Sequence, residues 1–82
     1  MKKIKTYRIG EQADYGIWKV VLRNDRCYLI GIDSETEEVK EQKVFNRNNL
    51  DAVRNFLFDI TTPFYADNIN GWILQQNEGA RA

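Results

Sequence analysis

The sequence contains no histidine, a single cysteine and a single serine, and these scarcities exclude several kinds of active site. Without histidine, the chain has no Ser–His or Cys–His pair for nucleophilic catalysis. The lone Cys27 allows no intramolecular disulfide and none of the common zinc ligand sets. Gly10 and Gly16 are too far apart for a phosphate-binding loop, and neither is followed by Lys-Ser or Lys-Thr. We therefore expect a protein that is not an enzyme and that holds no metal or other cofactor.

Long apolar runs are also missing. No segment approaches the ~18 apolar residues that a membrane-spanning helix needs. The lysines near the N-terminus are not followed by the apolar stretch of a secretory signal, and a lone cysteine fits a reducing compartment. These features predict a cytoplasmic protein.

The chain is long enough for one domain. Of its 82 residues, 43% are apolar, which suffices for one hydrophobic core. Isoleucine and valine outnumber leucine, and these β-branched residues favour strands. We expect a single compact domain over residues 1–78, followed by a flexible tail over residues 79–82.

Alternating apolar and polar residues predict four strands. They cover residues 3–9, 17–23, 27–32 and 39–45, and the second places Trp18 on a core face. The turn-prone residues 24–26 predict that the second and third strands form an antiparallel hairpin. A helix over residues 35–43 is the alternative to the fourth strand, but its apolar spacing is too sparse for docking.

A helix follows, and we expect one more strand after it. Apolar residues from Leu50 to Ile60 fall on one helical face, Asn48 or Asn49 provides the N-cap, and Pro63 ends the helix. Pro63 can itself open a short second helical turn. Asn70-Gly71 predicts a turn before a last strand over residues 72–75. The expected fold is α+β, an antiparallel sheet of four to five strands with one helix on one face, in the order β-β-β-β-α-β.

The two signs of charge are equal in number but unevenly distributed. Lysine plus arginine and aspartate plus glutamate number 12 each, so no net charge attracts nucleic acid. Residues 1–23 carry six positive and two negative charges, whereas residues 24–45 carry three positive and six negative. A surface polarised in this way can orient a protein partner and accelerate its association.

The acidic segment over residues 33–38 predicts a solvated turn. Its alternating carboxylates have the spacing of calcium ligands, but the central glycine of an EF-hand loop is missing. We interpret the turn as a negative patch for a basic partner, contacted through Glu35, Glu37 and Glu38.

A second candidate surface is formed by Phe58, near the end of the helix, and by the aromatic and polar segment that follows the helix. Its rings and short polar side chains have the composition of interface centres, although the rings can equally belong to the core. For Phe58, a stack with Arg54 is the alternative. The predicted contact residues of this segment are Phe58, Tyr65, Asp67, Asn68 and Asn70.

The N-terminal run Lys5-Thr6-Tyr7-Arg8-Ile9-Gly10, followed by Ala13 and Tyr15, resembles the opening of small type II-C anti-CRISPR proteins. Past Tyr15 the patterns differ, since those inhibitors carry several cysteines. The resemblance implies a compact unit that caps a Cas nuclease by surface contacts and performs no chemistry.

Together these features predict a small, non-enzymatic protein-binding module. Its expected action is that of an inhibitor of phage or mobile-element type, through surface contacts with a protein partner. Two alternatives remain open: a nucleic-acid-binding accessory protein that uses the basic residues from Lys2 to Arg8, and a homodimer that pairs its edge strands.

Overall fold

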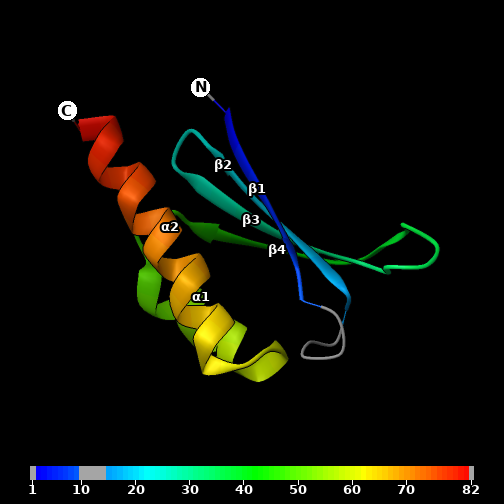
Figure 1. Ribbon diagram of the computed structural model, residues 1–82. Helices are drawn as coiled ribbons and strands as arrows, with labels where there is room; N and C mark the ends of the chain where they lie inside the picture. The colour runs from blue at the N-terminus through cyan, green and yellow to red at the C-terminus, as the bar shows by residue number, and fades with distance from the viewer. Residues whose placement is uncertain (1, 10–14, 82) are drawn as a thin grey trace.

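The computed structural model describes residues 2–9 and 15–81, apart from the side chains of residues 80 and 81. It contains one antiparallel sheet with the strand order β1-β2-β3-β4, followed in the chain by two helices (Figure 1). The elements are β1 (Lys2–Arg8), β2 (Ile17–Arg23), β3 (Arg26–Ile32), β4 (Val39–Asn46), α1 (Leu50–Ile60) and α2 (Pro63–Arg81).

The sheet has the strands that the sequence predicts, with bounds that differ by one residue at most. Asn24 begins the tight turn between β2 and β3 with a φ of 55°, a left-handed conformation that asparagine tolerates better than most residues. In the turn between β3 and β4, Asp33 Oδ1 accepts hydrogen bonds from the N–H groups of Glu35 (2.8 Å) and Thr36 (3.0 Å). The side chains of the turn residues therefore favour the conformations of both turns.

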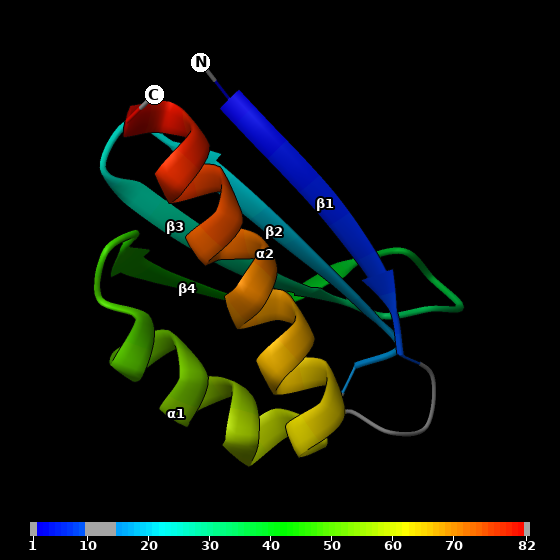
Figure 2. The same cartoon turned by 60° about the vertical axis from the view of Figure 1, so that its left-hand side comes forward.

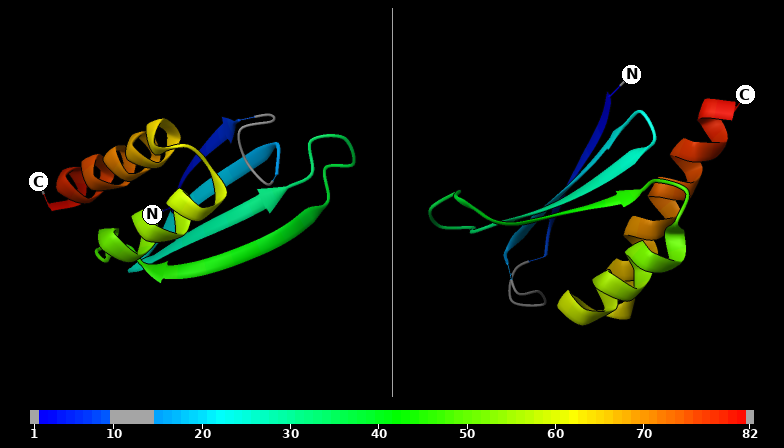
Figure 3. Two further views of the ribbon diagram at one scale, coloured as in Figure 1. Left: turned by 90° about the horizontal axis from the view of Figure 1, so that it is seen from below. Right: turned by 180° about the vertical axis from the view of Figure 1, so that it is seen from behind.

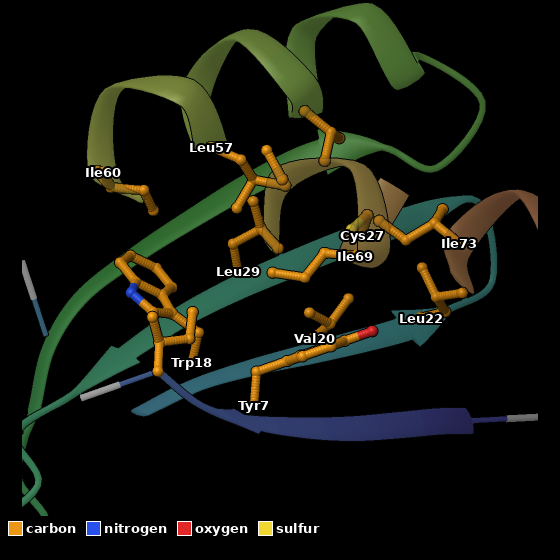
Figure 4. Close-up of a cluster of buried hydrophobic side chains, with 13 residues drawn as sticks. Tyr7, Trp18, Val20, Leu22, Cys27, Leu29, Leu57, Ile60, Ile69 and Ile73 are labelled. Carbon is orange, nitrogen blue, oxygen red and sulfur yellow. The ribbon is translucent and has the colours of Figure 1, made fainter. Parts of the chain in front are cut away.

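Both helices cover the same face of the sheet (Figures 1 and 3). Asn49 caps α1 by accepting a hydrogen bond from the N–H of Ala52, and Pro63 opens α2. The core forms between this face and one stripe of each helix (Figure 4). Its fully buried members with the largest side chains are Trp18, Leu22, Leu29, Leu57, Ile69 and Ile73.

The predicted last strand over residues 72–75 is wrong, because these residues lie within α2. The order is β-β-β-β-α-α, with two helices instead of one, and the predicted turn at Asn70-Gly71 is helical as well. The reason is a buried stripe with helical spacing, made by Ala66, Ile69, Ile73 and Asn77. Packing of this stripe against the sheet outweighs the local turn preference, and α2 continues to Arg81.

Asn77 ties the C-terminal half of α2 to the segment after β4. Its side-chain amide donates to the carbonyl of Arg47 at 2.8 Å and accepts from Arg47 Nε at 2.6 Å. Arg47 Nη1 also donates to the carbonyl of Asn24, at 3.1 Å. Three separate parts of the chain thus meet at one guanidinium group.

Replacing Asn77 with alanine is expected to lower the free energy of unfolding by about 1–3 kcal/mol, because Arg47 then loses its acceptor in a partly buried site. Urea denaturation measures the change. Gln75→Ala, at an exposed position of the same helix, is the control and should change stability by less than about 0.5 kcal/mol. Equal losses in the two variants would contradict the role given to Asn77.

Candidate protein interface

The sheet face opposite the helices is not covered by any described helix or strand (Figures 1 and 3). We call it the open face. Side chains alternate along each strand, so the neighbours of the core residues point to this side. The open face carries Lys2, Ile4, Thr6 and Arg8 from β1; Ile17, Lys19, Val21 and Arg23 from β2; Arg26, Tyr28, Ile30 and Ile32 from β3; and Gln42, Val44 and Asn46 from β4.

The centre of the open face is apolar. The strand register places Ile4, Val21, Tyr28 and Val44 opposite one another in a single row across all four strands. Ile4 is 52% exposed and Val44 is 43% exposed at the two ends of this row, whereas Val21 is only 9% exposed and Tyr28 is half-buried. Exposed apolar side chains on a sheet face that no described helix covers are typical of a protein–protein contact surface.

Five cations surround this apolar centre. They are Lys2, Arg8, Lys19, Arg23 and Arg26. The described ion pairs are Lys40–Glu38 and Arg54–Asp67, so none of the five forms a direct ion pair with a described carboxylate.

Some of these cations face each other across the strands. Arg23 lies directly opposite Lys2 on one side and Arg26 on the other. Like charges in such cross-strand pairs destabilise a sheet. An anionic partner would relieve this repulsion.

One end of the open face is hollowed. The open depression has a volume of about 720 Å³ and contains both apolar and charged groups. Its lining consists of Thr6, Arg8, Ile17, Lys19, Ile32 and Glu37. Its two cations, Arg8 and Lys19, outnumber its one carboxylate, Glu37, so the depression suits a side chain or chain end that is anionic and partly apolar.

The predicted acidic contacts lie away from the open face's centre, in the turn between β3 and β4. Glu35, Glu37 and Glu38 are all exposed, and Glu38 pairs with Lys40 at 3.0 Å. Glu37 has a φ of 61° and also lines the depression. Hydrogen bonds from the backbone N–H groups of Thr36 and Glu35 lower the pKa of Asp33, so its carboxylate stays ionised to a lower pH than an ordinary aspartate.

The predicted aromatic and polar contacts divide between structural and exposed positions. Tyr65 packs against the core, and Asn70 donates to the carbonyl of Leu50 at 3.1 Å. Asp67 pairs with Arg54 at 3.0 Å. The structure therefore places Tyr65, Asp67 and Asn70 in intramolecular contacts.

The exposed members of this segment are Phe58, Asp67 and Asn68, together with the neighbouring Phe64. The Arg54 guanidinium lies 4.6 Å from the centre of the Phe58 ring, which is the stacking alternative that the sequence indicates. Phe64 is 66% exposed and contacts Tyr65 edge to face. These side chains lie on the helical side of the molecule and do not join the open face.

Cys27 offers no reactive thiol. Its side chain is fully buried in the core, and burial raises the pKa of the thiol to about 11, although the nearby Arg47 charge opposes this shift. Cys27 is therefore protonated at neutral pH and shielded from reagents. Among the residues that the structure describes, no three Cys, Asp or Glu side chains are grouped as metal ligands would be.

Comparisons with protein-family models, curated proteins and solved structures found no match. Within the described ranges, neither helix combines the length and the apolar character that crossing a membrane requires. The proposal for function therefore depends on the surface of this chain alone.

The open face is not among the sites that the sequence predicts. Alternation along residues 17–23 separates Lys19 and Arg23 from Trp18, but it does not connect them with Lys2, Arg8 and Arg26 on the neighbouring strands. A usable signal was present: the segments 17–23 and 27–32 carry apolar residues at odd and even positions alike, which is unusual for a sheet with one wet face.

Proposed function

We propose that this protein is a non-enzymatic protein-binding module that contacts its partner through the open face. The observation that carries the proposal is the combination of an apolar row with five cations that form no direct ion pair with a described carboxylate. An apolar centre with a charged rim is the usual anatomy of a protein interface. The matching partner surface has an apolar centre and a rim of aspartate and glutamate.

Two features favour a protein over nucleic acid as the partner. The apolar row is mainly branched aliphatic, and Tyr28 is the one aromatic side chain that the described strands contribute to the open face. Single-stranded nucleic acids are bound by several aromatic side chains on which bases stack. Aliphatic side chains instead suit the apolar centre of another protein.

The same charges disfavour a second copy of this chain on the open face. Packing two open faces together would bring ten cations, five from each copy, into one interface without described counter-charges. The proposed partner is therefore a different, acidic protein.

A module of this kind acts by occupying its partner's surface. Inhibition of an enzyme, including a Cas nuclease, is the specific form that we propose for this action. It requires that the acidic partner surface overlap or adjoin the enzyme's active site.

Reversing three cations of the open face, in the variant Lys19→Glu/Arg23→Glu/Arg26→Glu, is expected to weaken partner binding by about 100-fold or more, mainly through slower association. The partner is first captured from nuclease-treated lysate on the wild-type protein, identified and purified. Its affinity is then measured by surface plasmon resonance at low and at physiological salt. The salt dependence should be much weaker for the variant.

The control variant Glu35→Lys/Glu38→Lys reverses two charges of the acidic turn that do not line the depression and should leave binding intact. Circular dichroism on both variants separates lost binding from lost folding. Loss of binding in the acidic-turn variant alone would transfer the site to that turn. If the variant Asn68→Ala alone loses partner binding, the binding site lies in the segment after α1.

A further inference from the structure

We propose that the free edge of β1 accepts an extended acidic segment of a partner protein as a fifth strand of the sheet. The proposal concerns the edge of the sheet and does not depend on the function of the open face. It is carried by the position of β1, the direction of its main-chain groups and its charge.

β1 is the first strand of the sheet and pairs only with β2 among the described strands. Figure 2 shows β1 at the margin of the sheet, with α2 in front of the sheet and no described helix or strand beyond the edge. Lys2 to Thr6 are all exposed. The outer side of β1 is therefore accessible to another chain.

One hydrogen bond shows which main-chain groups of β1 point toward β2 and which point away from it. The N–H of Ile9 donates to the carbonyl of Gly16 at 3.0 Å, and these two residues continue the register of β1 with β2. In an antiparallel pair, hydrogen-bonded positions alternate with non-hydrogen-bonded positions. Lys3, Lys5 and Tyr7 therefore bond inward to β2, whereas the N–H and carbonyl groups of Ile4 and Thr6 point to the free edge.

The charge of β1 defines the chemistry of the added strand. The seven residues of β1 include Lys2, Lys3, Lys5 and Arg8 and no acidic residue. Alternation puts Lys3 and Lys5 on one side of the strand and Lys2 and Arg8 on the other, so both sides are cationic. Glutamates on either side of an added strand would meet a cation directly opposite or diagonally.

A second copy of β1 and a nucleic acid fit this edge less well. Pairing β1 with itself would set lysines against lysines and arginine, which edge strands use to prevent such pairing. The edge presents alternating N–H donors and carbonyl acceptors, and only another peptide main chain satisfies both. The phosphates of a nucleic acid accept hydrogen bonds but do not donate them.

The test uses a synthetic ten-residue peptide of alternating glutamate and threonine, with both ends blocked, and the same peptide with glutamine in place of glutamate. Amide hydrogen exchange by NMR is measured with and without each peptide. We expect the acidic peptide to slow exchange at Ile4 and Thr6 by about tenfold or more, since their N–H groups become bonded. Exchange at Lys3 and Lys5 should change much less, and the glutamine peptide should have little effect.

Two substitutions at Thr6 isolate the main-chain contact. Thr6→Pro removes an outward N–H and no bond to β2, whereas Thr6→Val removes only the hydroxyl group. The proline variant should bind the acidic peptide about tenfold more weakly than wild type, and the valine variant within about twofold. The melting temperature of each variant verifies that it is folded.

Several results would overturn the proposal: equal affinity of the proline variant and wild type, equal protection by the glutamine peptide, or tighter binding of a single-stranded oligonucleotide to the same amides. Dimerisation through Ile4 and Thr6 without peptide would overturn it in favour of a second copy. In the variant Lys19→Glu/Arg23→Glu/Arg26→Glu, the acidic peptide should still slow amide exchange at Ile4 and Thr6. Failure of the proposed open-face function is therefore distinguishable from failure of the proposal for this edge.

Discussion

Trp18→Ala is expected to lower the free energy of unfolding by about 3–5 kcal/mol, a large part of the stability of a small domain. The Trp18 side chain is fully buried and lies between two other rings. Its ring centre is 5.6 Å from that of Tyr15 and 5.9 Å from that of Phe56. Removing it leaves a cavity between the sheet and α1 that the surrounding backbone cannot close.

Urea denaturation of the wild type and the variant measures this loss. Trp18→Phe is the matched control, because it retains a ring and removes an indole N–H for which no described group is an acceptor. Its cost should be clearly smaller than that of alanine. A loss below about 1 kcal/mol for Trp18→Ala would contradict the central position of this ring. Trp18 emission at the wavelength of a solvent-exposed indole, measured in a Trp72→Phe background, would contradict it as well.

Gly31→Ala is expected to cost about 1–3 kcal/mol through overpacking. Gly31 lies opposite Trp18 in the sheet, where the strand passes directly beneath two aromatic rings. A Cβ atom at this position would be 2.5 Å from Tyr15 Cδ2 and 2.9 Å from Trp18 Cη2. Both rings are held by the core, so relief requires the sheet to shift.

Gly71→Ala is the control, and the opposite sign is expected. Gly71 lies inside α2, and a Cβ atom there would meet nothing within 4 Å. Alanine in a helix interior is favoured over glycine by about 0.5–1 kcal/mol, so this variant should be more stable than wild type. Thermal and urea denaturation of both variants check the pair. A neutral Gly31→Ala would show that the rings above Gly31 can move.

Much of the fold is readable from short segments of the sequence. The alternation around Trp18 predicts β2, and the turn-prone residues after it predict the hairpin with β3. Asn49 and Pro63 mark the limits of α1 by capping and by steric exclusion. These features depend on neighbours within a few residues, so local physical chemistry decides them.

The segment after Pro63 shows where local reading fails. Asn70-Gly71 has the composition of a turn, and residues 72–75 have the composition of a strand. The buried stripe that includes Ile69 and Ile73 gains its free energy only when α2 lies on the sheet. That gain depends on residues far away in the sequence, so no local preference reveals it.

The candidate site, too, is only partly predictable from the sequence. Sequence analysis predicts contacts at the acidic turn and in the segment from Phe58 to Asn70, and the structure ties Tyr65, Asp67 and Asn70 into intramolecular contacts. The open face went unrecognised because its cations come from three strands and lie together only after the strands pair in register.

The sequence by itself determined the four strands, the tight turn between β2 and β3, the acidic turn between β3 and β4, the first helix and the absence of any histidine- or disulfide-based chemistry. Only the tertiary structure decided the state of residues 72–75 and the gathering of cations from three strands on the open face. The physical reason is that both depend on contacts between residues far apart in the chain, namely the packing of α2 on the sheet and the pairing of β1, β2 and β3 in register. The packing of α1 and α2 selects the face of Trp18 and leaves the face of Val21 and its surrounding cations open.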